Sequence, residues 1–284
     1  MRKRIKGLTA IGLLALLLTS CSSAPPVEAQ AQPESPTIYL MAEEAETPVQ
    51  DPIKLPISTT TSSAEEVETS SAPEPVKEAE LPAEHLIEDF PIIFQMPELP
   101  TGCEITAMTM ALNYYGYQVD KTTMAAEYLP TVPANRYHGE DGRLYGSDLR
   151  SYFVGDPFTQ AGYICGPKAI LTAANDYLQE MESSMRATDK SGASPEELYE
   201  LVSQNTPVVV WVTIGMADRE TPQGWYTESG DYVDWSTNDH GAVLIGYSED
   251  TVTIADPISG MVEYSRDQFE SVYTSRSCQC VILR

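Results

Sequence analysis

The sequence contains few cysteines and few histidines, and both shortages narrow the class of protein. Among 284 residues there are five Cys and three His. The four Cys beyond position 100 are too few for the disulfide framework of a small secreted domain. No Cys-x-x-Cys pair or His cluster is present to predict a metal site. We therefore expect no metal and no other cofactor.

Basic residues are also scarce. The chain has 17 Lys and Arg against 42 Asp and Glu, which gives a formal net charge of −25 at pH 7. Proteins that bind nucleic acid contact phosphates through clustered Lys and Arg, so this composition argues against such a partner. It argues equally against attachment to a membrane surface by charge. Our expectation for the oligomeric state is a monomer.

The N-terminus has a basic start followed by a short apolar run, Leu8 to Leu18. This run is too short to cross a bilayer. A membrane-spanning helix needs about 20 apolar residues, whereas this arrangement is typical of a secretory signal. Leu18-Thr19-Ser20-Cys21 resembles a lipobox, which predicts a lipoprotein signal peptide at 1–20 and lipidation of Cys21. Two acyl chains would anchor the protein to the extracytoplasmic face of the cell membrane. The alternative is an ordinary signal peptide with a chance Cys.

Residues 21–89 are rich in Glu, Pro, Ser, Thr and Ala and have almost no aromatics. Such a segment cannot bury enough apolar surface to offset its chain entropy, so it is predicted to be a disordered spacer. His85 falls within it and would not be held in place. Aromatic and apolar residues begin at Phe90, and residues 90–284 have a normal length for one domain.

The periodicity of residues 90–284 predicts helices first and strands afterwards. The expected helices are 104–115, 122–128, 167–178, 195–202 and 266–272. The expected strands are 92–94, 208–214, a hairpin within 225–235, 242–247, 251–255, 262–264 and 280–283, with 130–163 as loop. This order indicates an α+β fold, with N-terminal helices packed on a C-terminal antiparallel sheet.

Cys103 is the first candidate for chemistry because it follows Gly102 at the start of a predicted helix. The positive end of a helix dipole favours a thiolate, which is the reactive form of cysteine. Two alternatives remain. Cys103 could be a buried apolar residue, or the reactive thiol could be Cys165, which also precedes a helix.

His240 is the candidate base because it stands at the head of a predicted strand, 137 positions after Cys103. Papain-like enzymes keep their His roughly 130–150 residues after the Cys. Asp256 ends the next strand, and a hairpin brings both residues to one sheet edge, where Asp256 could orient the imidazole. Its alternative role is a turn-forming Asp before Pro. His138 lies in a loop and is expected to be exposed or substrate-facing.

Gln95 lies eight residues before Cys103 and is the candidate oxyanion donor, together with the Cys103 backbone N–H. A plain surface Gln is the alternative.

Over about residues 90–284, the motifs of the sequence resemble the peptidase C39-like family. The resemblance rests on 94–104, 112–116, 153–157, 240–247 and Asp256-Pro257. It implies a papain-like fold and a triad of Cys103, His240 and Asp256, with Gln95 as oxyanion donor.

This resemblance predicts an extracytoplasmic cysteine peptidase or amidohydrolase acting on peptide or isopeptide bonds. The best-known relatives cut double-glycine leaders on the cytoplasmic side, whereas the signal at Cys21 places this domain outside. Glu104 also follows the Cys where many cysteine peptidases have a small residue. The alternatives are an acyl transferase with the same triad, or a surface binding lipoprotein that uses the aromatic residues of 225–235.

Overall fold

The computed structural model describes residues 81–284. The predicted signal peptide, Cys21 and residues 21–80 of the predicted spacer lie outside the described residues. Within 81–284, no helix has both the length and the apolar character needed to cross a membrane.

The centre of the fold is an antiparallel sheet with the strand order β12-β11-β10-β7-β13-β6. Its strands are β6 (Ala187–Asp189), β7 (Val208–Thr213), β10 (Asp239–Tyr247), β11 (Thr251–Asp256), β12 (Gly260–Ser265) and β13 (Cys280–Leu283). All nine residues of β10 are buried, which is why that segment reads as a nearly continuous apolar run.

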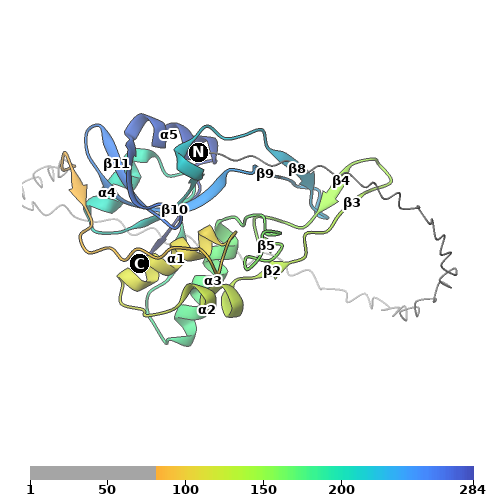
Figure 1. The fold of residues 1–284 in the computed structure, drawn as a ribbon, viewed down its shortest axis with the longest axis horizontal. Coiled ribbons are helices and arrows are strands. Elements are labelled where there is room, and N and C mark those ends of the chain that lie inside the picture. Colours follow the sequence, from red (N-terminus) through yellow and green to blue (C-terminus); the bar gives the residue numbers. More distant parts are fainter. Residues whose placement is uncertain (1–80) are drawn as a thin grey trace, which may run out of the picture. The chain divides into compact units, whose positions relative to one another are not determined.

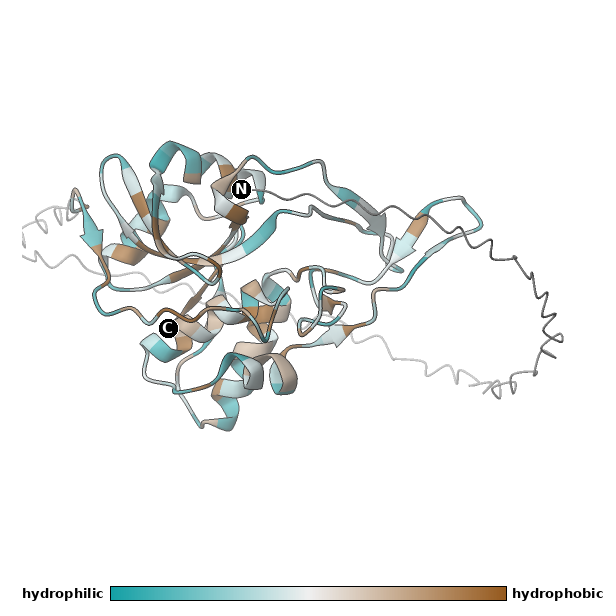
Figure 2. Cartoon of the chain, in the orientation of Figure 1, coloured by the Kyte–Doolittle hydropathy of each residue, from teal (hydrophilic) through white to brown (hydrophobic). Residues whose placement is uncertain are grey.

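Helices cover both faces of this sheet (Figure 1). They are α1 (Cys103–Tyr114), α2 (Lys121–Thr123), which continues as a π-helix over Met124–Tyr128, α3 (Pro167–Glu180), α4 (Pro195–Ser203) and α5 (Arg266–Ser275). Figure 1 shows α1, α2 and α3 on one face and α4 and α5 on the other. Apolar residues concentrate on the central strands and on the helix sides that face them (Figure 2). The predicted α+β fold is confirmed.

The folded part begins earlier along the chain than the composition indicated. Strand β1 (His85–Leu86) pairs with Tyr247 and Gly246 of β10, and Ile87 is buried in the core. His85 Nε2 also lies 2.9 Å from Asn205 Oδ1. The prediction that His85 cannot be held in place is therefore wrong, because a strand edge far along the chain supplies its partners. Residues 92–94 form no strand, and the next residue, Gln95, bonds through its N–H to Pro257 O.

A second, four-stranded sheet projects from the body, and we call it the arm (Figure 1). Its order is β3-β4-β8-β9, with β3 (Arg136–His138), β4 (Leu144–Gly146), β8 (Gln223–Tyr226) and β9 (Tyr232–Trp235). The hairpin of β8 and β9 was expected, whereas β3 and β4 fall in the stretch predicted as loop. A short parallel pair, β2 (Thr131–Val132) and β5 (Phe153–Val154), lies beside it. A small core around Trp225 joins the arm to the body.

Candidate active site

Cys103 is the first residue of α1 and is 6% exposed. As the first helical residue, its backbone N–H has no acceptor within the helix and is free to bind another group. The side chain lines a cavity of about 330 Å³. The same cavity is lined by the predicted base His240, the predicted oxyanion donor Gln95 and the aromatic residues Tyr163 and Trp235.

The structure brings His240 and Asp256 together, as the hairpin prediction required. His240 Nε2 lies 3.1 Å from Asp256 Oδ2. The second oxygen, Oδ1, accepts hydrogen bonds from the backbone N–H groups of Ile258 (2.7 Å) and Ser259 (2.9 Å). Asp256 is therefore fixed on both oxygens, and Nδ1 of His240 is the ring nitrogen left to take a proton.

Burial by itself would raise the pKa of Asp256. The hydrogen bond and charge of His240, with the two backbone N–H groups, outweigh burial and hold the pKa of this carboxyl below its usual value. Asp256 therefore stays ionised through the neutral range, as a group that orients an imidazole and stabilises its protonated form must do.

Gly241 brings the predicted base, His240, close to the predicted nucleophile, Cys103. A Cβ at this position would lie 2.8 Å from Cα and 3.1 Å from N of Glu104, at the start of α1. Only glycine lets β10 approach the helix so closely. The Gly241 backbone N–H lies near the Cys103 sulfur and acts to lower the pKa of the thiol. Adjacent residues of β10 thus contact Cys103 and carry the base.

We expect Gly241→Ala to lower kcat/KM by about a hundredfold, since an ångström of misplacement has that effect at an active site. It should also lower the free energy of unfolding by about 1–3 kcal/mol, as overpacking does. Kinetics and urea denaturation measure the two effects. Gly246→Ala is the matched control on the same strand, because its Cβ would press on Leu86 and Thr253, away from the cavity. Full activity of Gly241→Ala would contradict this account of the contact.

The thiol itself has an unexpected partner. Cys103 Sγ donates to Glu104 Oε2 at 3.3 Å, and Glu104 Oε1 accepts from the Cys165 backbone N–H at 3.1 Å. Glu104 is 1% exposed, and burial raises its own pKa. Sequence reasoning noted Glu104 as unusual but missed these contacts, because nothing in the local pattern predicts its burial.

Burial raises the pKa of the Cys103 thiol well above its usual value, and the negative charge of Glu104 raises it further. The expected effect of the helix start on the thiolate is therefore opposed in this structure. The helix dipole is a local effect, and here it is outweighed by desolvation and a neighbouring carboxylate. The raised pKa favours the protonated thiol, which donates to Glu104 Oε2.

Cys165, the alternative nucleophile, is completely buried and does not line the cavity. Burial and the Glu104 charge raise its pKa well above the usual value too. His138 is exposed on β3 of the arm, as expected. Of the two thiols at helix starts, Cys103 alone borders the cavity with His240.

Gln95 lines the cavity, but its amide is already engaged. Its Nε2 donates to the carbonyl oxygens of Leu99 (3.2 Å) and Pro100 (3.0 Å). Its Oε1 is buried and has no hydrogen-bond partner among the described residues. The role of oxyanion donor stays a prediction, and it requires Gln95 to redirect at least one N–H toward the cavity.

A buried network of ion pairs surrounds Asp239, the residue that precedes His240 in the sequence. Asp239 is fully buried and accepts from Arg219 Nε at 2.8 Å, while Arg276 Nη1 lies 3.1 Å from its other oxygen. This network fixes the start of β10 and hence the backbone of His240. The sequence analysis placed Asp239 in a polar loop, and no local signal marks its two distant partners. In residues 81–284, no cluster of His, Cys, Asp and Glu is arranged to hold a metal ion.

Comparison with known proteins agrees with this fold. The Peptidase_C39 like family matches residues 87–281, and the chain belongs to that family. It is similar to a Bacillus anthracis protein whose crystal structure is described as a C39-like peptidase, with a TM-score of 0.62 and 31% identity, covering 71% of this chain and 97% of the other.

Two curated relatives are uncharacterized. One is YvpB of Bacillus subtilis (strain 168), 28% identical over 189 residues, which are 66% of this chain and 71% of that protein. The other is MTBMA_c00490 of Methanothermobacter marburgensis, 25% identical over 134 residues, which are 45% of this chain and 89% of that protein. The family and papain-like fold predicted from the motifs are thereby confirmed, while the substrate is not defined by these relatives.

Proposed function

We propose that this chain is a cysteine peptidase or amidohydrolase that cleaves peptide or isopeptide bonds. The observation that carries the proposal is the His240–Asp256 pair, bonded at 3.1 Å, in one cavity with Cys103 at a helix start. The lipobox-like sequence at Cys21 supports a lipid-anchored position outside the cytoplasmic membrane.

Catalysis begins when the Cys103 proton passes to His240 Nδ1 and the thiolate attacks the carbonyl carbon of the scissile bond. Negative charge then develops on the carbonyl oxygen, where the Cys103 N–H and a redirected Gln95 amide can donate. The protonated His240 gives its proton to the leaving amine, and an acyl thioester forms on Cys103. His240 then takes a proton from water, whose attack releases the acid and the free thiol.

Before the first step, Glu104 holds the Cys103 S–H in one orientation. Its carboxylate accepts a hydrogen bond from the thiol in the resting structure, so substrate binding must turn that S–H toward His240 before transfer. Both the thiol and its acceptor are buried, which keeps the nucleophile unreactive toward other electrophiles when the cavity is empty.

Cleavage of pooled quenched-fluorescent peptides by the full chain tests the function. Wild type should turn over at least one pool, and Cys103→Ala should lose that activity. Cys165→Ala is the matched control, since it removes a buried thiol that also lies beside Glu104, and it should retain activity. Cleavage that survives Cys103→Ala would overturn the proposed function.

A further inference from the structure

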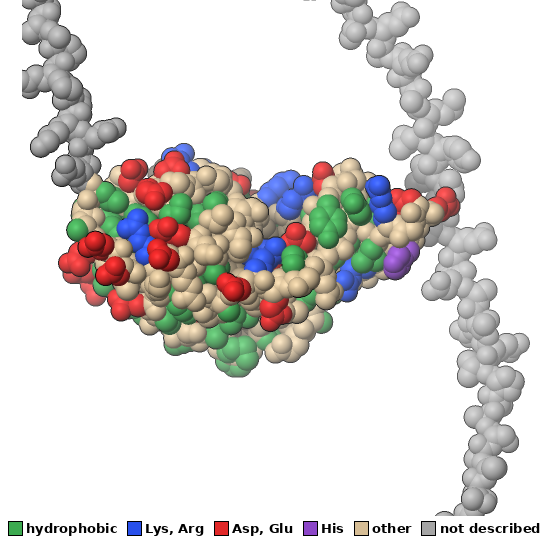
Figure 3. Space-filling model, turned by 90° about the horizontal axis from the view of Figure 1, so that it is seen from above, with side chains coloured by type: hydrophobic (Ala, Val, Ile, Leu, Met, Phe, Trp, Pro, Cys, Tyr) green, Lys and Arg blue, Asp and Glu red, His purple; other side chains and the backbone are tan. Residues whose placement is uncertain are grey.

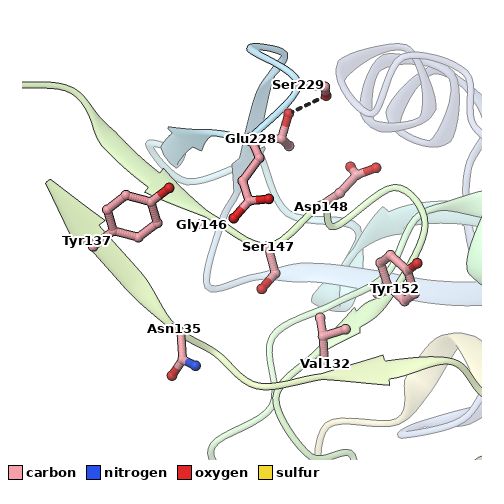
Figure 4. Close-up of a pocket in the computed structure, with 10 residues that line it drawn as sticks. Val132, Asn135, Tyr137, Gly146, Ser147, Asp148, Tyr152, Glu228 and Ser229 are labelled. Carbon is pink, nitrogen blue, oxygen red and sulfur yellow. Dashed lines mark hydrogen bonds between the residues drawn. The ribbon is translucent and has the colours of Figure 1, made fainter. Parts of the chain in front are cut away.

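A second cavity, of about 580 Å³, lies on the arm. It opens between the segment that joins β2 to β3 and the turn that joins β8 to β9 (Figure 4). Its lining is Val132, Asn135, Tyr137, Gly146, Ser147, Asp148, Tyr152, Thr227, Glu228 and Ser229. Most of these residues are polar or aromatic, which is the chemistry of a binding site rather than of a packing defect.

The arm cavity contains a carboxylate that is not paired with a Lys or Arg side chain of residues 81–284. Figure 4 shows the Glu228 carboxylate directed into the space beside Tyr137 and Ser147. Glu228 forms no hydrogen bond or ion pair with the described residues. Asp148, by contrast, forms an ion pair with Arg150, with 2.8 Å between Oδ1 and Nε. No Lys or Arg lines the cavity. A phosphate or carboxylate ligand would therefore meet repulsion, and a cation would meet a free counter-charge.

Two tyrosines supply the walls. Tyr137 is 53% exposed and Tyr152 is 42% exposed, and both rings line the cavity. An ammonium or guanidinium group is attracted to the face of such a ring, and the Asn135 side-chain oxygen can accept a hydrogen bond from it. The combination of a carboxylate, aromatic rings and neutral acceptors fits a Lys or Arg side chain.

A chain of contacting residues connects the linings of the two cavities. Tyr163 and Trp235 line the active-site cavity, with ring centroids 4.7 Å apart. The Tyr163 ring also contacts Trp225, at 6.0 Å between centroids. Trp225 Nε1 donates to the carbonyl of Ser147, which lines the second cavity.

We propose that the arm cavity is a substrate subsite for a basic residue of the peptide, with Glu228 as its counter-charge. This rests on the proposed peptidase function and names its substrate class. The surface favours the same partner, because residues 81–284 hold 30 Asp and Glu against 11 Lys and Arg. Figure 3 shows most of the visible acidic side chains on the lobe that lies away from the arm. The net negative charge therefore attracts cationic peptides at long range, and at the cavity itself the counter-charge is Glu228.

Binding to the full chain carrying Cys103→Ala tests the subsite independently of turnover. The probes are fluorescein-labelled Ala-Ala-Lys-Ala-Ala-Lys-Ala-Ala and the same peptide with Gln or Glu in place of Lys, measured by fluorescence anisotropy. The Lys peptide should bind about tenfold more tightly than the Gln peptide. Adding Glu228→Gln should remove about fivefold of that preference, and Tyr137→Ala should reduce it as well.

Glu249→Gln is the matched control, because it removes the same charge from the exposed turn between β10 and β11. Equal binding of the Lys and Gln peptides would overturn the subsite, as would equal losses in the two Glu variants. A Lys preference that depends on Glu228, without cleavage by wild type, would support the subsite while contradicting the peptidase. Cleavage with no Lys preference would overturn only the subsite.

Discussion

Asp256→Asn is expected to lower kcat by about a thousandfold to ten-thousandfold, the range seen when an orienting carboxylate becomes an amide. The reason lies in the two backbone N–H groups that bond to Oδ1 of Asp256. An Asn would turn its oxygen to these donors and its NH₂ to His240. The imidazole would then carry its proton on Nδ1, the nitrogen that must accept the Cys103 proton.

Steady-state kinetics on a cleaved peptide measure this effect, and circular dichroism checks the fold. Asp250→Asn is the control, since it makes the same change at an exposed position of the β10–β11 turn, and it should leave kcat within about twofold of wild type. If Asp256→Asn kept kcat within about tenfold of wild type, the orienting role of Asp256 would be refuted.

Glu104→Gln is expected to raise the rate of Cys103 alkylation by iodoacetamide near neutral pH by about tenfold to a hundredfold. Burial is the main cause of the raised Cys103 pKa, and the Glu104 charge is the next. Gln keeps an oxygen for the Cys165 N–H but removes the charge. The pKa of the thiol therefore falls, and each unit multiplies the thiolate fraction about tenfold below that pKa.

The pH dependence of the alkylation rate shows whether Glu104 raises or lowers the pKa of the Cys103 thiol. The rising limb of the alkylation rate should move to lower pH in Glu104→Gln. The two proteins should converge at acidic pH, where wild-type Glu104 is itself protonated. Glu249→Gln, which removes one charge far from the thiol, should leave the profile in place. A profile that moves to higher pH in Glu104→Gln would show that Glu104 promotes the thiolate rather than the thiol.

The sequence was sufficient for the parts of the site that depend on neighbours along the chain. The helix after Cys103 and the hairpin that joins His240 to Asp256 follow from apolar periodicity and a tight turn. Both are observed, with every predicted bound within three residues of the observed one. The hairpin alone brings the base and its carboxylate to one edge.

Features that depend on distant partners escaped prediction. Strands β3 and β4 have only three residues each, and β4 pairs with β8 about 80 positions further on, so no local pattern marks them. The buried contacts of Glu104 with Cys165, and of Asp239 with Arg219 and Arg276, also cross large separations. The raised pKa of the Cys103 thiol escaped prediction for the same reason, because desolvation of Cys103 is a consequence of tertiary packing.

Peptide mapping after labelling with an epoxysuccinyl peptide, an irreversible probe of cysteine peptidases, tests the central claim most directly. Cys103 borders the cavity with His240, whereas Cys165 is sealed in the core. Mass spectrometry should therefore find one adduct, on Cys103, and this adduct should be lost in His240→Ala. An adduct on Cys165, or labelling of Cys103 that does not need His240, would contradict the account.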